Sequence, residues 1–66
     1  MERQRRSDDD MLTRVELAEA LHVSARTVDR WVRDGTGPPF IRLPRNRLRW
    51  RWGDVVAWLA ERREGG

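Results

Sequence analysis

The sequence predicts a small α+β protein, mainly α with a small β-hairpin, in the order helix, helix, strand, strand, helix. Three observations predict this class. Two helix-start signals, at Thr13 and Ser24, lie close together near the N-terminus; apolar residues alternate with arginines over residues 40–52; and an apolar, helix-like stretch follows at residues 54–59. Since the chain has only 66 residues, these elements fill one domain, which we expect to span residues 11–63.

The first helix is expected to begin after Thr13 and to end near Leu21. Thr13 and Glu16 have the spacing of a capping box, in which the threonine hydroxyl accepts from the backbone N–H of Glu16 and the carboxylate reaches back. Leu17 begins the apolar face of this helix. His22 follows at a turn, where a left-handed backbone is easier for histidine than for most residues. A second helix is therefore expected after a short connection.

That second helix is expected to begin after Ser24, a favourable N-cap residue. Val28, Trp31 and Val32 recur at the spacing of one helix face and predict a buried stripe. Gly35 suits the left-handed position that ends a helix. Two prolines follow at positions 38 and 39, and because no helix continues through such a pair, we expect a stiff connector there.

Residues 40–52 are expected to form a β-hairpin. Its two runs alternate apolar residues with arginines, and this alternation predicts strands with one buried face and one cationic face. The alternating positions are Ile41, Arg42 and Leu43 in the first run, and Arg47, Leu48, Arg49, Trp50, Arg51 and Trp52 in the second. Pro44, Arg45 and Asn46 form the turn, because proline pre-sets a turn position and asparagine tolerates a positive φ.

Gly53 or Asp54 is expected to cap a third helix, which has Trp58 among its apolar contacts. Both ends of the chain are polar. Residues 1–10 lack any hydrophobic period and predict a disordered N-terminal arm, while residues 64–66 are expected to fray.

The composition excludes most enzyme chemistry. The chain has one histidine and no cysteine, tyrosine or lysine, which leaves little acid–base or nucleophilic equipment and no thiolate zinc site. Asp8, Asp9 and Asp10 fall in the predicted arm, where no fixed geometry holds a metal ion, and His22 alone makes no metal site. We therefore expect a protein that is not an enzyme and uses neither cofactor nor metal. The absence of a long apolar stretch and of a signal core predicts a cytoplasmic protein with no membrane partner.

The net charge of +3 is modest, but its distribution is uneven. Residues 42–51 contain five arginines and no carboxylate, whereas acidic and basic residues nearly cancel elsewhere. A concentrated cationic stripe of this kind is typical of a nucleic-acid binder. Like charges on one hairpin repel one another unless a polyanion neutralises them, so the stripe favours a nucleic-acid partner.

These features resemble the winged helix-turn-helix domains of the excisionase and MerR-like superfamily, whose excisionases are also called recombination directionality factors. The helix-turn-helix part of the resemblance rests on Leu17, Ala18, Val23, Val28 and Trp31. It continues through Gly35, Pro38, Pro39, Phe40 and the arginine-rich hairpin to the Asp54–Leu59 helix with its Trp58. Two positions depart from the family pattern: His22 stands where the turn usually has glycine, and the hairpin tip is not glycine-rich.

The resemblance implies a protein that binds double-stranded DNA, with the second helix in the major groove and the hairpin, called the wing, against the backbone or the adjacent minor groove. The residues expected to contact the major groove are Ser24, Arg26, Thr27, Arg30 and Arg33. Those expected to contact phosphates or the minor groove are Arg45, Asn46, Arg47 and Arg49. Arg26 and Arg30 are the candidates for bidentate contacts with guanine. Trp52, at the strand end, is a candidate contact for a neighbouring copy or a recombinase.

The resemblance further implies an excisionase-like architectural factor, bacterial or phage-encoded, that bends DNA near an attachment site and directs an integrase toward excision. Its implied partners are DNA, an integrase and neighbouring copies of the chain on DNA, and no small-molecule effector is expected. MerR regulators continue into a dimerisation helix and an effector domain where this sequence ends, which favours the excisionase. Two alternatives stay open: a small winged-helix transcriptional regulator, repressor or activator, and a protein-interaction module whose wing binds an acidic partner.

Overall fold

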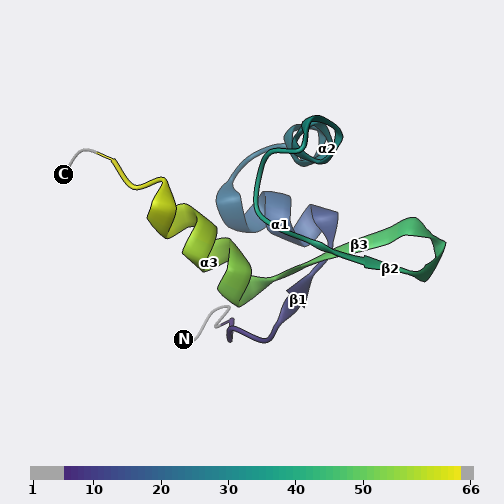
Figure 1. Ribbon diagram of the computed structural model, residues 1–66, viewed down its shortest axis with the longest axis horizontal. Coiled ribbons are helices and arrows are strands. Elements are labelled where there is room, and N and C mark those ends of the chain that lie inside the picture. The colour runs from purple at the N-terminus through teal and green to yellow at the C-terminus, as the bar shows by residue number, and fades with distance from the viewer. Residues whose placement is uncertain (1–5, 65–66) are drawn as a thin grey trace.

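The computed structural model describes residues 6–64; residues 1–5 and 65–66, parts of the predicted arm and of the predicted frayed end, lie outside the described residues. The described elements are β1 (Met11–Leu12), α1 (Arg14–Leu21), α2 (Ala25–Asp34), β2 (Ile41–Leu43), the 3₁₀ turn η1 (Pro44–Asn46), β3 (Arg47–Arg51) and α3 (Trp52–Glu61). The α+β class and the order helix, helix, strand, strand, helix are confirmed. Figure 1 shows α1 and α2 next to each other, with α3 and the hairpin tip at opposite ends of the molecule.

The two caps that begin α1 and α2 are formed as the sequence predicts. Thr13 Oγ1 accepts from the backbone N–H of Glu16 at 3.1 Å, and Glu16 Oε1 accepts from the backbone N–H of Thr13 at 2.9 Å. Ser24 Oγ accepts from the backbone N–H of Thr27 at 3.1 Å. Because the caps satisfy N–H groups that a helix start leaves open, both helices begin at fixed residues.

Left-handed residues end both of these helices. His22 has φ 58° and ψ 42°, and its backbone N–H donates to carbonyls of the last turn of α1. Gly35 closes α2 in the same way with φ 75°. Histidine thus takes the conformation that the turn requires, although its β-carbon adds strain that glycine would not have.

The sheet contains a strand that the sequence does not predict. Its order is β1-β3-β2, and both outer strands run antiparallel to β3. β1 has only two residues, too few for an alternating pattern, and pairs Met11 with Arg51 and Leu12 with Trp50. Directly opposed residues point to the same side of a sheet, so Leu12 and Trp50 lie together, and both are buried.

Each strand of the hairpin alternates as expected, but the two strands together do not form one apolar face and one cationic face. Ile41 pairs with Arg49 and Leu43 pairs with Arg47, so the apolar residues of β2 share a face with arginines of β3. The physical reason is the three-residue turn η1, which brings Leu43 directly opposite Arg47 and thereby sets the register. The alternation within each strand is predicted by the sequence, but the pairing register between the two strands is not.

The hairpin tip also takes an unusual backbone conformation. Arg45 has φ 68° and Asn46 has φ 57°, whereas the sequence indicated a positive φ for Asn46 alone. A left-handed backbone costs a residue with a β-carbon free energy, and asparagine tolerates it better than arginine does. The tip therefore holds an arginine in a conformation that its residue type does not favour.

The third helix begins earlier than expected. Trp52 is its first residue rather than the last of a strand, and neither Gly53 nor Asp54 is its N-cap. Backbone carbonyls of the N-terminal segment take the place of a side-chain cap: the Trp52 N–H donates to the Asp10 carbonyl at 2.8 Å, and the Gly53 N–H donates to that of Asp8 at 3.0 Å. Since these acceptors come from a distant part of the sequence, no local signal marks this helix start.

Residues 6–10, which belong to the predicted arm, pack against the same helix start. The Arg6 guanidinium lies 5.3 Å from the centre of the Trp52 ring, and the Asp9 carboxylate lies 3.3 Å from Arg51 Nη2. Together with the two backbone hydrogen bonds, these contacts hold the described end of the arm against the start of α3.

The core lies where the three helices meet the sheet. Its buried residues are Leu12, Leu17, Ala18, Val28, Trp50 and Val55. Trp50 is 1% exposed, and its ring centre lies 5.8 Å from that of Phe40. The half-buried rings of Trp31 and Trp58, 5.5 Å apart, join α2 to α3. These three tryptophans therefore support the packing of the domain.

Candidate nucleic-acid interface

Three arginines lie on the outward face of α2. Arg26, Arg30 and Arg33 are exposed, and together with Asp29 they line one hollow of about 540 Å³. Their spacing of three and four residues places them on one side of the helix. No carboxylate of the described residues pairs with Arg26 or Arg30, whereas Arg33 Nε lies 3.6 Å from the carboxylate of the next residue. The donors of Arg26 and Arg30 are thus directed to solvent, where an external acceptor can meet them.

Two further residues expected at the major groove hold the first turn of α2. In addition to the cap, Ser24 Oγ and Thr27 Oγ1 lie 3.1 Å apart and share a hydrogen bond. Ser24 is exposed and Thr27 is half-buried. The two hydroxyls therefore fix the N-terminal end of the helix, the end that a helix-turn-helix presents to DNA. Direct contacts from them stay a prediction.

The wing (residues 41–51) presents arginine at its tip. Arg45, Asn46 and Arg47 are all exposed. Arg49 is half-buried, and its Nη1 donates to the backbone carbonyl of the preceding residue at 2.9 Å. Arg45 and Arg47 are consequently the more accessible cations, while Arg49 keeps part of its donor set within the strand.

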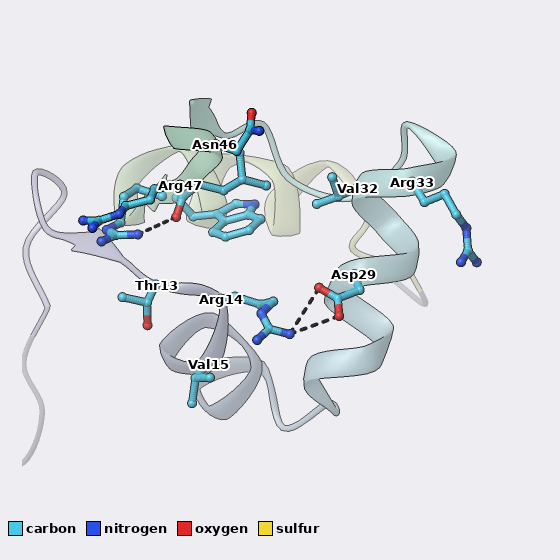
Figure 2. Close-up of a pocket in the computed structure, with 11 residues that line it drawn as sticks. Thr13, Arg14, Val15, Asp29, Val32, Arg33, Asn46 and Arg47 are labelled. Atoms are coloured by element: carbon cyan, nitrogen blue, oxygen red, sulfur yellow. Dashed lines mark hydrogen bonds and ion pairs between the residues drawn. The ribbon is translucent and has the colours of Figure 1, made fainter. Parts of the chain in front are cut away.

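A second hollow, of about 490 Å³, lies between the wing, α2 and the start of α1. The polar side chains around it include Arg14 from α1, Asp29 and Arg33 from α2, and Asn46, Arg47 and Arg49 from the wing. Figure 2 shows Arg14 and Asp29 pointing toward each other, with Asn46 and Arg47 on the wing side. The two elements expected to contact DNA therefore border one common hollow.

Two basic residues of this surface were missed by the sequence reasoning. Arg14 Nη1 donates to both carboxylate oxygens of Asp29, at 3.0 and 3.3 Å, and so ties α1 to α2. Nothing in the spacing of these two residues signals the contact. Arg42 Nη1 donates to Asn46 Oδ1 at 3.3 Å, and its guanidinium lies 5.7 Å from the centre of the Phe40 ring. Its place in the carboxylate-free stretch was the one signal that could have singled it out.

The arginine at the end of β3 differs from those at the wing tip because carboxylates offset its charge. Arg51 is half-buried, and its guanidinium forms ion pairs with Asp54 at 3.2 Å and with Asp9 at 3.3 Å, so its charge is offset within the chain. Trp52 is half-buried against the core, and Arg6 covers part of its ring. A protein contact through Trp52 stays a prediction.

The chemistry offered by this surface is hydrogen bonding by guanidinium groups. Their planar forks match phosphate oxygens and the O6 and N7 atoms of guanine. Within residues 6–64 no group of three or more metal-binding side chains gathers at one place. None of the helices in that range has the length and apolar character to cross a membrane. The arginines of α2 and those of the wing line two hollows that share Asp29 and Arg33, and such a surface suits a polyanion.

Comparison with known proteins also indicates a nucleic-acid-binding domain. A protein-family model described as a helix-turn-helix domain matches residues 11–63, a range that contains every helix and strand described above. Searches of curated proteins and of solved structures give no match.

Proposed function

This chain belongs to the helix-turn-helix domain family, which binds DNA and is not a family of enzymes, and we propose that it acts as an excisionase-like architectural factor. In this proposal α2 enters the major groove, and the wing contacts the backbone and the adjacent minor groove. The bound protein bends the DNA beside an attachment site, and the bend directs an integrase toward excision. The protein contributes charge neutralisation and groove contacts to this process.

The observation that carries the proposal is the common hollow between α2 and the wing. A phosphodiester strand separates a major groove from its neighbouring minor groove, so a protein that uses both grooves must straddle one strand. The lining of the hollow includes Arg33 from α2, Arg47 from the wing and Arg14 from α1. Arg14 offsets the Asp29 carboxylate that also lines the hollow, and the Arg33 side chain extends away from it in Figure 2. The hollow, of about 490 Å³, gives that strand a place to lie between the two elements.

Base reading is assigned to α2 in this proposal. Arg26 and Arg30 donate to guanine O6 and N7, and each good bidentate contact discriminates by about 1–3 kcal/mol. Ser24, Thr27 and Arg33 contact the flanking backbone and keep the helix in register.

Phosphate and minor-groove contacts are assigned to the wing, through Arg45, Asn46, Arg47 and Arg49. If these three arginines neutralise about three phosphates, they add about −2.7 to the slope of log K against log salt. A narrow minor groove concentrates negative potential and attracts inserted arginine, so bent DNA gains contacts there. Bending a short site costs on the order of 1–6 kcal/mol, which these contacts offset.

The proposed protein partners are an integrase and neighbouring copies of the chain bound side by side. Side-by-side binding extends the small footprint of a single domain along the DNA. Trp52 is the proposed protein contact, since a half-buried indole at the start of α3 can supply apolar area to a partner. The proposed location is the cytoplasm of a bacterium, where attachment-site DNA and integrase meet.

A DNase footprint across the DNA that flanks the protein's own gene tests this function. We expect protected blocks that repeat at about one helical turn, roughly 10.5 base pairs, beside an integrase attachment site. A single protected block over a promoter would contradict the excisionase proposal and favour a transcriptional regulator. If no DNA were protected even at low salt, the remaining hypothesis would be a protein-interaction module whose wing binds an acidic partner.

Two arginine variants serve as a matched pair in that footprint. Arg30→Ala removes a charge from the reading face of α2 and is expected to abolish the protected pattern at limiting protein concentration. Arg63→Ala removes the same charge from the exposed segment that follows α3, and it is expected to leave the pattern intact. The C-terminal end of α3 lies away from the wing (Figure 1). Equal loss from both variants would mean that net charge, not the α2 surface, determines binding.

A further inference from the structure

We propose that Asp29 determines part of the DNA specificity by accepting a hydrogen bond from the amino group of a cytosine in the major groove. The inference rests on the proposed DNA-binding function and deepens it, because it names a base that one side chain selects. It also gives Arg14 the role of a positioning residue.

The position of Asp29 places its carboxylate among the reading arginines. It lines the same hollow as Arg26, Arg30 and Arg33, and its side chain is 58% exposed. It follows Arg26 by three positions and precedes Arg33 by four, so the three residues are attached on one side of the helix. Any DNA surface that these arginines approach is therefore approached by Asp29 as well. In Figure 2 the Asp29 carboxylate turns toward Arg14, and the Arg33 side chain extends away from it.

A carboxylate on such a surface distinguishes base contacts from phosphate contacts. It repels phosphate oxygens, so it weakens binding that depends on the backbone alone. Cytosine presents the N4 amino group, a donor that an aspartate satisfies. Adenine also presents an amino group, but beside the N7 acceptor, which a carboxylate without a proton cannot satisfy. The chemistry of the side chain thus selects cytosine.

The ion pair with Arg14 fixes this carboxylate without using all of its acceptor capacity. Arg14 Nη1 donates to Oδ2 at 3.0 Å and to Oδ1 at 3.3 Å (Figure 2). Two carboxylate oxygens offer about four lone-pair sites, so acceptor sites remain for a base. Because Arg14 belongs to α1, the contact aims the carboxylate from outside its own helix. The guanidinium also offsets the negative charge that would otherwise face the DNA backbone.

Selection of binding sites from a randomised pool of DNA duplexes tests the inference. The full chain and its Asp29→Asn, Asp29→Glu and Arg14→Ala variants are each used, and the enriched sequences are compared position by position. Thermal unfolding by circular dichroism establishes that every variant is folded at the selection temperature. Asparagine matches aspartate in shape but adds a donor, so it favours adenine, whereas glutamate keeps the acceptor.

The wild-type chain is expected to enrich cytosine at one position next to guanines. Asp29→Asn is expected to lose that preference by about tenfold or more and to shift it toward adenine, while Asp29→Glu retains it. Arg14→Ala is expected to weaken the preference for cytosine, because the carboxylate is no longer held in position, and to bind every sequence more weakly, because the charge of that carboxylate is no longer offset.

Three results would overturn the inference, and they separate it from the proposed function. If Asp29→Asn enriches the same bases as the wild type, Asp29 reads no base. If the wild-type chain binds duplexes but enriches no sequence, DNA binding stands without a reading carboxylate. If the wild-type chain binds no duplex at low salt, the proposed function fails and the inference fails with it.

Discussion

The second helix and the wing are both rich in arginine, but they hold it differently. α2 places two carboxylates, Asp29 and Asp34, among its arginines, and caps fix both ends of the helix. The wing has no carboxylate between residues 41 and 51, and its tip is a three-residue turn with two positive φ angles. A mixed, rigid surface favours discrimination, whereas a uniformly basic one favours affinity for any backbone. We therefore expect α2 to read the DNA and the wing to hold it.

The largest expected effect of a substitution is a loss of stability at Trp50. Trp50 is buried in the core, and it also lines the hollow between the wing and α2. We expect Trp50→Ala to lower the free energy of unfolding by about 3–5 kcal/mol, a large share of the stability of so small a domain. Urea unfolding followed by circular dichroism measures the loss, and Trp50→Phe is the control with a smaller one. An unchanged unfolding midpoint would show that the two elements do not depend on this side chain.

The next effect concerns affinity and belongs to the wing. Arg45→Ala combined with Arg47→Ala removes two exposed cations of the tip. Each lost phosphate contact flattens the salt slope by about 0.9, so the pair weakens binding about 60-fold at 0.1 M salt, taken relative to 1 M. Fluorescence anisotropy with one preferred and one scrambled duplex is the measurement. The double variant is expected to lose affinity for both duplexes alike, and a loss confined to the preferred duplex would make the wing a reader.

The contrast between helices and sheet also explains what could be predicted from the sequence. Thr13 and Ser24 start their helices, and His22 and Gly35 end them, through contacts within about one turn of chain. Helix boundaries set by such local contacts can be predicted from a short stretch of sequence. β1 and the start of α3 have other causes, because each exists through partners in a distant segment. Those features could not be predicted from local spacing.

The same reasoning applies to the candidate site. The outward position of Arg26 and Arg30 follows from the helix period and from the buried stripe opposite them, so the sequence was sufficient to find it. Their contacts with DNA stay predictions. The pairing of Arg14 with Asp29 depends on how α1 packs against α2, and no pattern in either helix specifies that packing. Charge placed by secondary structure was therefore predictable, and charge placed by tertiary structure was not.

A smaller effect, on discrimination, is expected from the reading helix. Arg30→Ala removes a candidate guanine contact from α2 and is expected to cost about 2 kcal/mol of preference for the correct base pair. Affinity for a scrambled duplex should change far less, which is the reverse of the result expected for the wing. Competition binding with single-substitution duplexes measures the preference at each position. An equal loss of affinity for every duplex would mean that α2, like the wing, contributes general affinity and does not discriminate between bases.

The smallest effect separates the shape of the wing tip from its charge. Arg45 has a left-handed backbone at φ 68°, which costs a residue with a β-carbon about 1–2 kcal/mol. Glycine avoids that strain but loses more conformational entropy on folding than alanine, by roughly 0.5–1 kcal/mol. We therefore expect Arg45→Gly to be more stable than Arg45→Ala by about 0.5–1 kcal/mol, measured by thermal unfolding.

Both variants lack the same charge, so they are expected to lose the same amount of DNA affinity, about eightfold at 0.1 M salt relative to 1 M. Equal affinities with different stabilities would show that the tip binds DNA through its charge and that its backbone strain affects folding alone. If Arg45→Ala bound more tightly than Arg45→Gly, the rigid tip itself would contribute to binding. The wing would then share the rigidity that distinguishes α2, and the difference between the two elements would lie in their carboxylates.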